Sequence, residues 1–487
     1  MLNKLSSIAS GFFSVEERDG VASNIRYAFM SQAIALASGF VMSLVVPKVL
    51  GVTEYAHWQL FLFYAGYVAI TILGVGDGLY LRLGGKRFFD IDGASLKSEA
   101  ILITASQVCI VFVIWAASLT VAMDDGLRFV LNAVLVYGLV QNCYGIIAPV
   151  FQAVNLTRVY SLSIAMSKLV FLVLMFFCIL SGMPSYEPLV VSYIIGSLFS
   201  LLYCLICANS LLSVRHAPVS TVVKPLLWDM RNGFRVMIAY YASALIVGVA
   251  RQIVVAKWGL ETFGQMSFAF SIVSFALMFI AQLSLVLFPV LRRLDLEHLS
   301  NYYAKIRDLL FVISPLAYFI YFPLSFFLGI WLPDYADSFR YLGILMPILV
   351  FDGKMNMLCS TYFKVYNDTR QLLFFNLLAL AISLFLSYIG AFALNNVEFV
   401  ICGSLFAIMV RSMVSERYLA VKRLHLSYSK SLMLECLMAV GFVCSVNIGG
   451  AVSLLVPFGL YVLSFFLNRE AFESVRKTLA NRGDSRS

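Results

Sequence analysis

Long apolar segments separated by short polar breaks follow one another along almost the whole chain. A helix needs about 20 apolar residues to cross the hydrocarbon core of a bilayer, and most of these segments reach that length. We therefore predict an all-α polytopic membrane protein with about 14 transmembrane helices. The predicted spans are 24-47, 57-81, 98-123, 127-151, 158-182, 187-213, 233-256, 262-291, 306-332, 338-363, 369-394, 396-420, 429-447 and 451-468.

The first span has a counterpart in the second half of the chain. Residues 26–48 (RYAFMSQAIALASGFVMSLVVPK) align with 235–257 (RVMIAYYASALIVGVARQIVVAK), with basic residues at both ends and Gly39 opposite Gly248. The match continues in the following loop, where LGVTEYA precedes the second span and WGLETFG precedes the eighth. Shared basic ends and a shared glycine-containing loop indicate two repeats of roughly 200 residues.

An even number of predicted spans separates the paired helices, so both repeats insert in the same direction and form two parallel six-helix lobes. A substrate path is expected between them, with rocking of one lobe against the other as the transport step. The expected organisation is a cytoplasmic N-terminal segment (1-23), an N-lobe (24-216), a C-lobe (217-425), two further helices (426-468) and a basic cytoplasmic tail (469-487).

Composition supports this assignment. With 61% hydrophobic and only 13% charged residues, the chain of 487 residues has too few charges to cover the surface of a soluble protein. The net charge of +9 does not indicate a nucleic-acid partner, since most of the 35 Lys and Arg fall in every second loop. Lys48, Arg128, Lys257 and Arg340 are the basic residues in predicted outer segments. The positive-inside rule therefore places both termini in the cytoplasm.

Catalytic and metal chemistry find little support in the sequence. The four His are scattered, and the chain lacks a glycine-rich phosphate loop, HExxH and GxSxG. The nine Cys lie mostly inside apolar spans, where packing explains them better than metal or disulfide roles. The N-terminus has no long apolar core with a cleavage site, so we expect no removable signal peptide. We predict a transporter rather than an enzyme, with no catalytic residue, metal or cofactor.

Several predicted spans carry small and polar residues at helical spacing along one face, which is the face turned away from lipid. Such a stripe serves either close helix packing or the lining of a wet cavity, and its presence on many helices favours the cavity. The stripes are Ala28, Gln32, Ala35, Gly39 and Ser43; Gln59, Gly66, Gly74 and Asp77; Gly138, Gln141, Asn142, Gly145, Pro149 and Gln152; and Gly264, Ser267, Ser271, Ser274 and Gln282.

Among the basic residues of the predicted spans we single out Arg26, near the inner end of the first span, and four others: Lys168, Arg251, Lys354 and Arg411. A central Arg or Lys costs about 2.5 to 3.5 kcal/mol on insertion scales, so each is a candidate functional residue. The alternatives are a buried ion pair for Lys168, and snorkelling to the nearer interface for Arg251 and Arg411. Arg251 stands where the first repeat has a methionine, on the face expected to meet the other lobe.

Acidic residues inside spans are fewer. Asp77, Asp352 and Glu435 are the candidates for binding a coupling H⁺ or Na⁺. Asp352 is close enough in sequence to neutralise Lys354, although a spacing of two residues turns them to different helix faces. A cavity lined mainly by Arg and Lys suits an anionic ligand such as a phosphate or pyrophosphate.

Two segments also resemble a known family. The sequence PKVLGVTEYAHWQLF (47–61), followed by GVGDGLYLRLGGKRFFDIDG (74–93), resembles the bacterial O-antigen and capsule flippases (Wzx type) of the multidrug/oligosaccharidyl-lipid/polysaccharide (MOP) exporter superfamily. FPVLRRL (288–294) is similar to the counterpart of this motif in the second lobe.

The resemblance implies an inner-membrane flippase for an undecaprenyl-pyrophosphate-linked glycan used in O-antigen, capsule or exopolysaccharide synthesis. It implies a V-shaped pair of lobes, alternating access, and coupling to an H⁺ or Na⁺ gradient or to the membrane potential. Membrane lipids, a polysaccharide polymerase and chain-length machinery are the expected partners. Helices one, two, seven and eight would line the path and place Arg26, Gln32, Asp77, Arg251 and Gln282 near the head group. A lipid II flippase and an ion-coupled multidrug antiporter are the alternatives.

Overall fold

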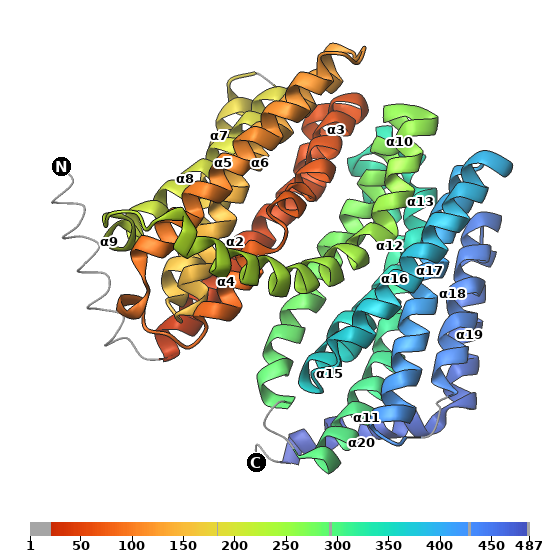
Figure 1. Ribbon diagram of the computed structural model, residues 1–487. Coiled ribbons are helices and arrows are strands. Elements are labelled where there is room, and N and C mark those ends of the chain that lie inside the picture. The colour runs from red at the N-terminus through yellow and green to blue at the C-terminus, as the bar shows by residue number, and fades with distance from the viewer. Residues whose placement is uncertain (1–20, 183, 292–294, 427–429, 485–487) are drawn as a thin grey trace. The chain divides into compact units, whose positions relative to one another are not determined.

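The computed structural model describes residues 21–182, 184–291, 295–426 and 430–484, and this part of the chain is helical, with no β-strand (Figure 1). The all-α prediction is confirmed. The helices are α2 (Val21–Phe40), α3 (Val46–Ala65), α4 (Val75–Leu83), α5 (Gly93–Ser118), α6 (Asp125–Ala153), α7 (Thr157–Leu180), α8 (Tyr186–Cys207), α9 (Asn209–Leu212), α10 (Val219–Leu291), α11 (Leu296–Ile313), α12 (Ala317–Trp331), α13 (Ser338–Leu345), α14 (Pro347–Lys354), α15 (Ser360–Val365), α16 (Thr369–Tyr388), α17 (Val397–Tyr418), α18 (Ser431–Ile448), α19 (Val452–Leu467) and α20 (Arg469–Asp484).

Within the described residues, 11 helical segments are long and apolar enough to cross a membrane, or 12 if α19 and the start of α20, bent by 81°, count as one span. The two longest segments, Arg26–Ile72 and Val219–Ser284, each contain two predicted spans. The structure therefore agrees with the expected series of apolar helices, and the lower number arises because two pairs of spans are joined end to end.

Each joined pair is interrupted at one glycine. Gly51 has φ 70° and ψ 177°, and Gly259 has φ 83° and ψ −173°. This combination of positive φ and extended ψ is nearly restricted to glycine. The two residues stand at matching positions of the LGVTEYA and WGLETFG loops, so the sequence repeat coincides with a repeated backbone break.

The contacts divide the chain into two compact units, Met1–Tyr241 and Ala242–Ser487. In the first, α5 to α8 lie side by side, with α2 packed on α7 and α3 packed on α6 and α8 (Figure 1). In the second, α17 packs against α13, α14 and α16, and α18 pairs with α19. The division falls inside α10, and the expected lobe boundary at 216/217 stays a prediction.

Some expectations about individual segments need correction, and others fall outside the described residues. The span 57-81 is not one helix, because helical geometry is lost after α3 and resumes at α4. Residues 219–232, expected to be a loop, are the start of α10, and much of the tail forms α20, which packs on α11. The N-terminal segment up to residue 20, and residues 292–294 of the FPVLRRL motif, lie outside the described residues.

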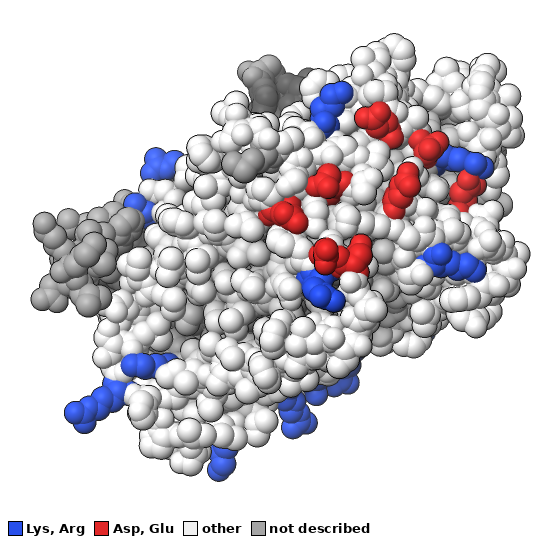
Figure 2. All heavy atoms as spheres, turned by 90° about the horizontal axis from the view of Figure 1, so that it is seen from above, with Lys and Arg blue, Asp and Glu red and all other residues white. Residues whose placement is uncertain are grey.

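Charge is distributed unevenly over the surface. On the face shown in Figure 2, acidic side chains gather in one region, with several basic side chains among them. The loops that the predicted topology places on the outer side carry six acids, Glu54, Asp124, Asp125, Glu261, Asp334 and Asp337, together with Lys48 and Lys257.

Candidate functional site

The second predicted span is broken near its middle. After α3 the chain forms a 3-10 turn over Val68–Ile72, then Leu73 (φ 50°) and Gly74 (φ 77°) take left-handed conformations before α4 begins. A break in a membrane helix frees backbone groups that lipid cannot satisfy. Discontinuous helices of this kind form substrate and ion sites in secondary transporters.

Three polar side chains, Thr71, Gln107 and Asn142, form a hydrogen-bond network at the break. Gln107 Nε2 donates to the carbonyl of Thr71 at 3.2 Å, and Gln107 Oε1 accepts from Thr71 Oγ1 at 2.7 Å. Asn142 Nδ2 lies 2.8 Å from both Gln107 Oε1 and Thr71 Oγ1. Gln107 and Asn142 are 2% and 3% exposed, so this network is shielded inside the first unit. The polar stripe on the fourth span thus includes a residue that supports the broken helix.

A pocket of about 310 Å³ opens beside the break. Its lining includes Asp77 in the first turn of α4, Gly145 and Pro149 of α6, and Tyr240 and Tyr241 of α10. Asp77 is exposed, whereas its neighbours Gly76 and Gly78 are buried. The pocket therefore combines one accessible carboxylate with aromatic walls, at the position of a predicted coupling-ion residue.

Glycines let α4 approach its neighbours at backbone distance. A Cβ added to Gly78 would collide with the backbone of Asp229, and one added to Gly233 would collide with the carbonyl of Gly74. A Cβ on Gly76 would collide with the carbonyl of Gly145. These contacts fix the broken helix against α6 and α10, and they explain the glycine-rich sequence GVGDG at residues 74–78.

Arg82 links three helices at the end of α4. Its guanidinium lies 2.6 Å from Glu99 Oε2 and 2.7 Å from Asp229 Oδ2, and both acidic side chains are 1% exposed or less. Desolvation alone would lower the pKa of Arg82, but the two carboxylates outweigh it and raise that pKa above its ordinary value. Sequence reasoning missed this cluster because its members are far apart in the chain.

Lys168 of α7 lies beside an aromatic side chain. Its ammonium is 3.4 Å from the hydroxyl of Tyr193 and 5.0 Å from the ring centroid. Tyr193 itself packs among rings that include Trp58, Phe61 and Phe171. Among the residues that the structure describes, no carboxylate lies within ion-pair distance of Lys168. The buried ion pair considered as an alternative is thus not formed within this part of the chain.

Arg251 of α10 is 8% exposed, so its side chain does not extend to the surface of its unit. Its guanidinium donates to Ser267 Oγ at 3.0 Å and lies 5.1 Å and 5.3 Å from the rings of Phe263 and Phe270. A guanidinium at these distances from aromatic rings makes cation–π contacts. Its described contacts are therefore to a hydroxyl and two rings.

Lys354 of α14 is held by two acids. Its ammonium lies 2.8 Å from Glu416 Oε2 of α17 and also contacts Glu435 Oε2 of α18. We call these three residues the Lys354 triad; their side chains are 0%, 5% and 0% exposed. The triad brings together a predicted substrate-binding residue and a predicted coupling-ion residue. Glu416 was not predicted, since it lies close to the predicted cytoplasmic end of its span.

Arg411 and Asp352, two other predicted site residues, pair with each other. The guanidinium of Arg411 contacts Asp352 Oδ1 and lies 2.5 Å from Ser243 Oγ. Arg411 is 3% exposed. Asp352 therefore neutralises Arg411 rather than Lys354, as the different helix faces of positions 352 and 354 require.

The remaining candidates have fewer contacts. Arg26 is exposed, with its guanidinium 5.9 Å from the ring of Tyr27, and Gln32 and Gln282 are half-buried on α2 and α10. The structure thus joins four predicted site residues in two ion-paired groups. Lys168 lies beside an uncharged tyrosine instead.

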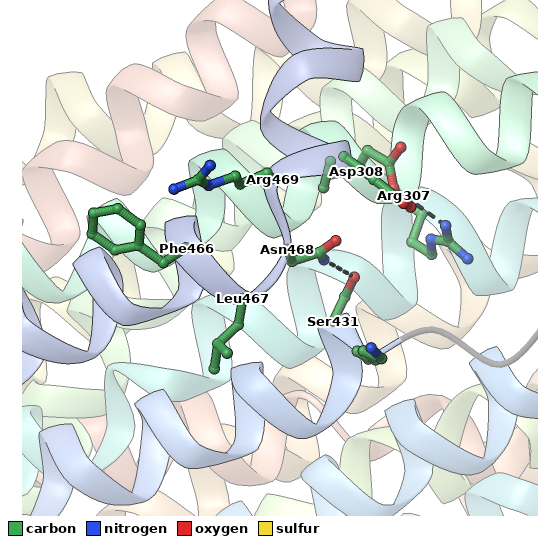
Figure 3. Close-up of a pocket in the computed structure, with 10 residues that line it drawn as sticks. Arg307, Asp308, Ser431, Phe466, Leu467, Asn468 and Arg469 are labelled. Carbon is green, nitrogen blue, oxygen red and sulfur yellow. Dashed lines mark hydrogen bonds and ion pairs between the residues drawn. The ribbon is translucent and has the colours of Figure 1, made fainter.

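A second pocket, of about 430 Å³, lies in the second unit where α19 turns into α20 (Figure 3). We call it the α20 pocket. Arg307 and Asp308 of α11 line it together with Lys430, Ser431 and the segment 466–471. Asn468 Nδ2 donates to Ser431 Oγ at 2.8 Å across it. Its charged residues lie in the predicted cytoplasmic tail or at the cytoplasmic ends of predicted spans.

The fold is similar to that of solved membrane transporters. A structure of the lipid II flippase MurJ, in an inward closed conformation, matches with a TM-score of 0.66 and 11% identity over 93% of this chain and 100% of that chain. An inward-facing MATE family multidrug transporter of the MOP superfamily matches with a TM-score of 0.53 and 15% identity over 83% and 98%. An outward-facing MATE family transporter matches with a TM-score of 0.52 and 16% identity over 81% of this chain and 95% of that chain.

No protein-family model and no curated protein matches the sequence. At identities this low, the likeness establishes the fold: the chain has the helical fold of MOP-superfamily transporters.

Proposed function

We propose that this protein is a flippase that moves an undecaprenyl-pyrophosphate-linked oligosaccharide from the cytoplasmic to the periplasmic leaflet of the bacterial inner membrane. Alternating access of the two repeats carries the head group, and the product serves O-antigen, capsule or exopolysaccharide synthesis. The termini are cytoplasmic, and an H⁺ or Na⁺ gradient or the membrane potential drives the cycle. A polysaccharide polymerase and its chain-length machinery act on the translocated glycan.

The observation that carries this proposal is the environment of Lys168. Arg82, Lys354 and Arg411 are neutralised by acids, whereas Lys168 faces the hydroxyl and ring of Tyr193. An ammonium inside a membrane span whose charge is not cancelled by an acid suits an anionic ligand. A pyrophosphate head group supplies that charge, and Arg251 is the second candidate for contacting it.

Asp77 and the broken second span provide polar groups of another kind. The pocket beside α4 has one accessible carboxylate and two tyrosines, which suits hydroxyl-rich sugar units more than phosphate. We assign Gln32 and Gln282 to the same role, since amides both donate to and accept from sugar hydroxyls. Arg26, exposed near the predicted cytoplasmic interface, is assigned to initial capture of the pyrophosphate.

The test is reconstitution in proteoliposomes that contain a labelled undecaprenyl-pyrophosphate-linked oligosaccharide. Accessibility of the glycan to an added glycosidase reports which leaflet it occupies. We expect transfer between leaflets to depend on the protein and to be reduced by Lys168→Ala. If the protein transfers none of the pyrophosphate-linked glycans tested, the proposal is contradicted.

A lipid II flippase is the second candidate, because the MurJ match covers more of this chain than the MATE matches do. Rescue of a strain depleted of its lipid II flippase would favour it. A multidrug antiporter is the third candidate: the environment of Lys168 counts against it, whereas the carboxylate and aromatic walls of the pocket beside α4 favour it. Export of cationic dyes in place of glycans would favour that activity.

A further inference from the structure

The Lys354 triad sits at the meeting point of three helices of the second unit. Lys354 comes from the end of α14, Glu416 from the last turns of α17, and Glu435 from the first turns of α18. All three side chains are at most 5% exposed. Charges this deeply buried are costly unless each is paired and hydrogen-bonded.

The triad contains one ammonium and two carboxylates, so its ionised form carries one excess negative charge. Lys354 donates to Oε2 of both acids. Glu435 Oε1 is buried, and within the described residues it has no hydrogen-bond partner. Burying a carboxylate oxygen without a hydrogen-bond partner costs free energy. A proton bound to Glu435 would cancel the excess negative charge of the triad.

Neighbouring charges do not remove this excess. Arg307 of α11 interacts electrostatically with Glu435, but it also pairs with Asp308 at 3.3 Å. Arg411 is paired with Asp352. Cys359, Cys436, Tyr303 of α11 and Tyr318 of α12 also interact with the triad, and thiols and phenols cannot supply a positive charge.

Two further helices pack on α18 without supplying a compensating charge to the triad. The basic residue of α13, Arg340, lies beside Asn447 and Glu398, near the opposite end of α18. Tyr461 of α19 donates to the carbonyl of Val312. One net negative charge therefore remains among the described groups around Glu435.

We propose that the Lys354 triad is a reversible proton-binding site, with Glu435 as the acceptor. A metal cation is disfavoured because the ammonium of Lys354 already lies between the two carboxylates. The described residues also contain no group of three or more His, Cys, Asp or Glu placed to hold a metal ion. Proton binding leaves one ammonium opposite one carboxylate, with the other acid neutral.

The α20 pocket offers protons a route to the triad. Ser431 lines the pocket and lies one helical turn before Glu435 on the same face of α18. Arg307 lines the same pocket (Figure 3). Its charge also acts on Glu435. Glu435 does not line the pocket itself, so the route we infer runs from these two lining residues to the acceptor.

Proton binding at this site changes how α18 is held. With Glu435 ionised, Lys354 is bound by two anions; with Glu435 neutral, its strong pairing is with Glu416 alone. The site therefore links protonation to the contact between α18 and the α14–α17 pair. A role for this link in driving transport rests on the proposed flippase function, whereas proton binding itself does not.

The test is a pH titration of the purified full-length protein, in detergent and without substrate, followed by the infrared band of protonated carboxyl groups. Glu435→Gln keeps the shape and an acceptor for Lys354 but cannot titrate. We expect a reversible pH-dependent band in the wild type and its loss in Glu435→Gln. The control is Glu187→Gln, an exposed acid in the first turn of α8, which should retain the band.

A band that is the same in wild type and Glu435→Gln would overturn the proposal. If Glu435→Gln does not fold, Glu435→Asp replaces it. The proposal then requires that the titration midpoint of the band shift in Glu435→Asp and stay at the wild-type value in Glu187→Gln. Transport is measured separately with pyrophosphate-linked glycan in proteoliposomes. Intact proton binding without glycan flipping would refute the flippase function and leave the site standing, whereas flipping without Glu435-dependent proton binding would refute the site alone.

Discussion

Gly51 and Gly259 hold matching positions in the two repeats and share a backbone conformation that other residues rarely adopt. A Cβ at either residue would meet no atom within 4 Å, so the constraint comes from the backbone and not from packing. Each marks the point where one predicted span ends and the next begins. The shared conformation is the structural form of the sequence repeat.

Gly51→Ala and Gly259→Ala should each destabilise the protein by about 1–3 kcal/mol, because alanine must adopt the strained conformation or straighten the chain. The thermal unfolding midpoint in detergent measures the loss. Gly459→Ala is the matched control: it also has open space around its Cα but lies inside α19 without positive φ. That substitution should leave stability unchanged or raise it. Equal effects at all three glycines would contradict the assignment of strain.

The span series and the repeat could be predicted, because apolar length and matching loops are local properties of the sequence. The glycine-containing loops were recognised, but the sequence did not indicate that a single glycine would interrupt an otherwise continuous helix in each. The break at Leu73 and Gly74 was missed, since its support comes from Gln107 and Asn142, which are distant in the chain. Apolar content alone made residues 57-81 look continuous. The glycine-rich GVGDG sequence was the available signal.

The ion pairs show the same limit. Charged residues inside spans could be found from the sequence, but which acid neutralises which base depends on helix packing. Lys354 meets Glu416 and Glu435, and Arg411 meets Asp352. Only the separation of Lys354 from Asp352 followed from helix geometry.

Removal of Arg82 should be strongly destabilising. Arg82→Ala leaves the buried carboxylates of Glu99 and Asp229 without their cation, a change that costs about 3–5 kcal/mol for buried pairs. The control is Arg340→Ala, whose side chain is 60% exposed in its pair with Glu398 and should contribute about 0–1 kcal/mol. Chemical or thermal unfolding in detergent distinguishes the two. Similar losses in both variants would mean that the Arg82 cluster is not buried as described.

Substitutions of Lys354 and of Glu435 in the Lys354 triad should differ in their effect on stability. Lys354→Met leaves two buried carboxylates facing each other and should cost about 3–5 kcal/mol of unfolding free energy. Glu435→Gln removes the excess charge and should be close to neutral at the same pH. Unfolding midpoints of the two variants, measured in parallel, provide the comparison. A larger loss for Glu435→Gln than for Lys354→Met would contradict the charge count.

Leaflet transfer of a labelled undecaprenyl-pyrophosphate-linked oligosaccharide by Lys168→Ala and Arg251→Ala tests the central claim most directly. Hydrogen bonds to charged groups contribute about 1.5–3 kcal/mol, so each variant should flip about tenfold more slowly or worse at normal protein level in the membrane. Lys168→Arg, which keeps the charge, should retain more activity than Lys168→Ala. Undiminished transfer by both alanine variants, at normal protein level, would contradict the account of a cationic path for a pyrophosphate head group.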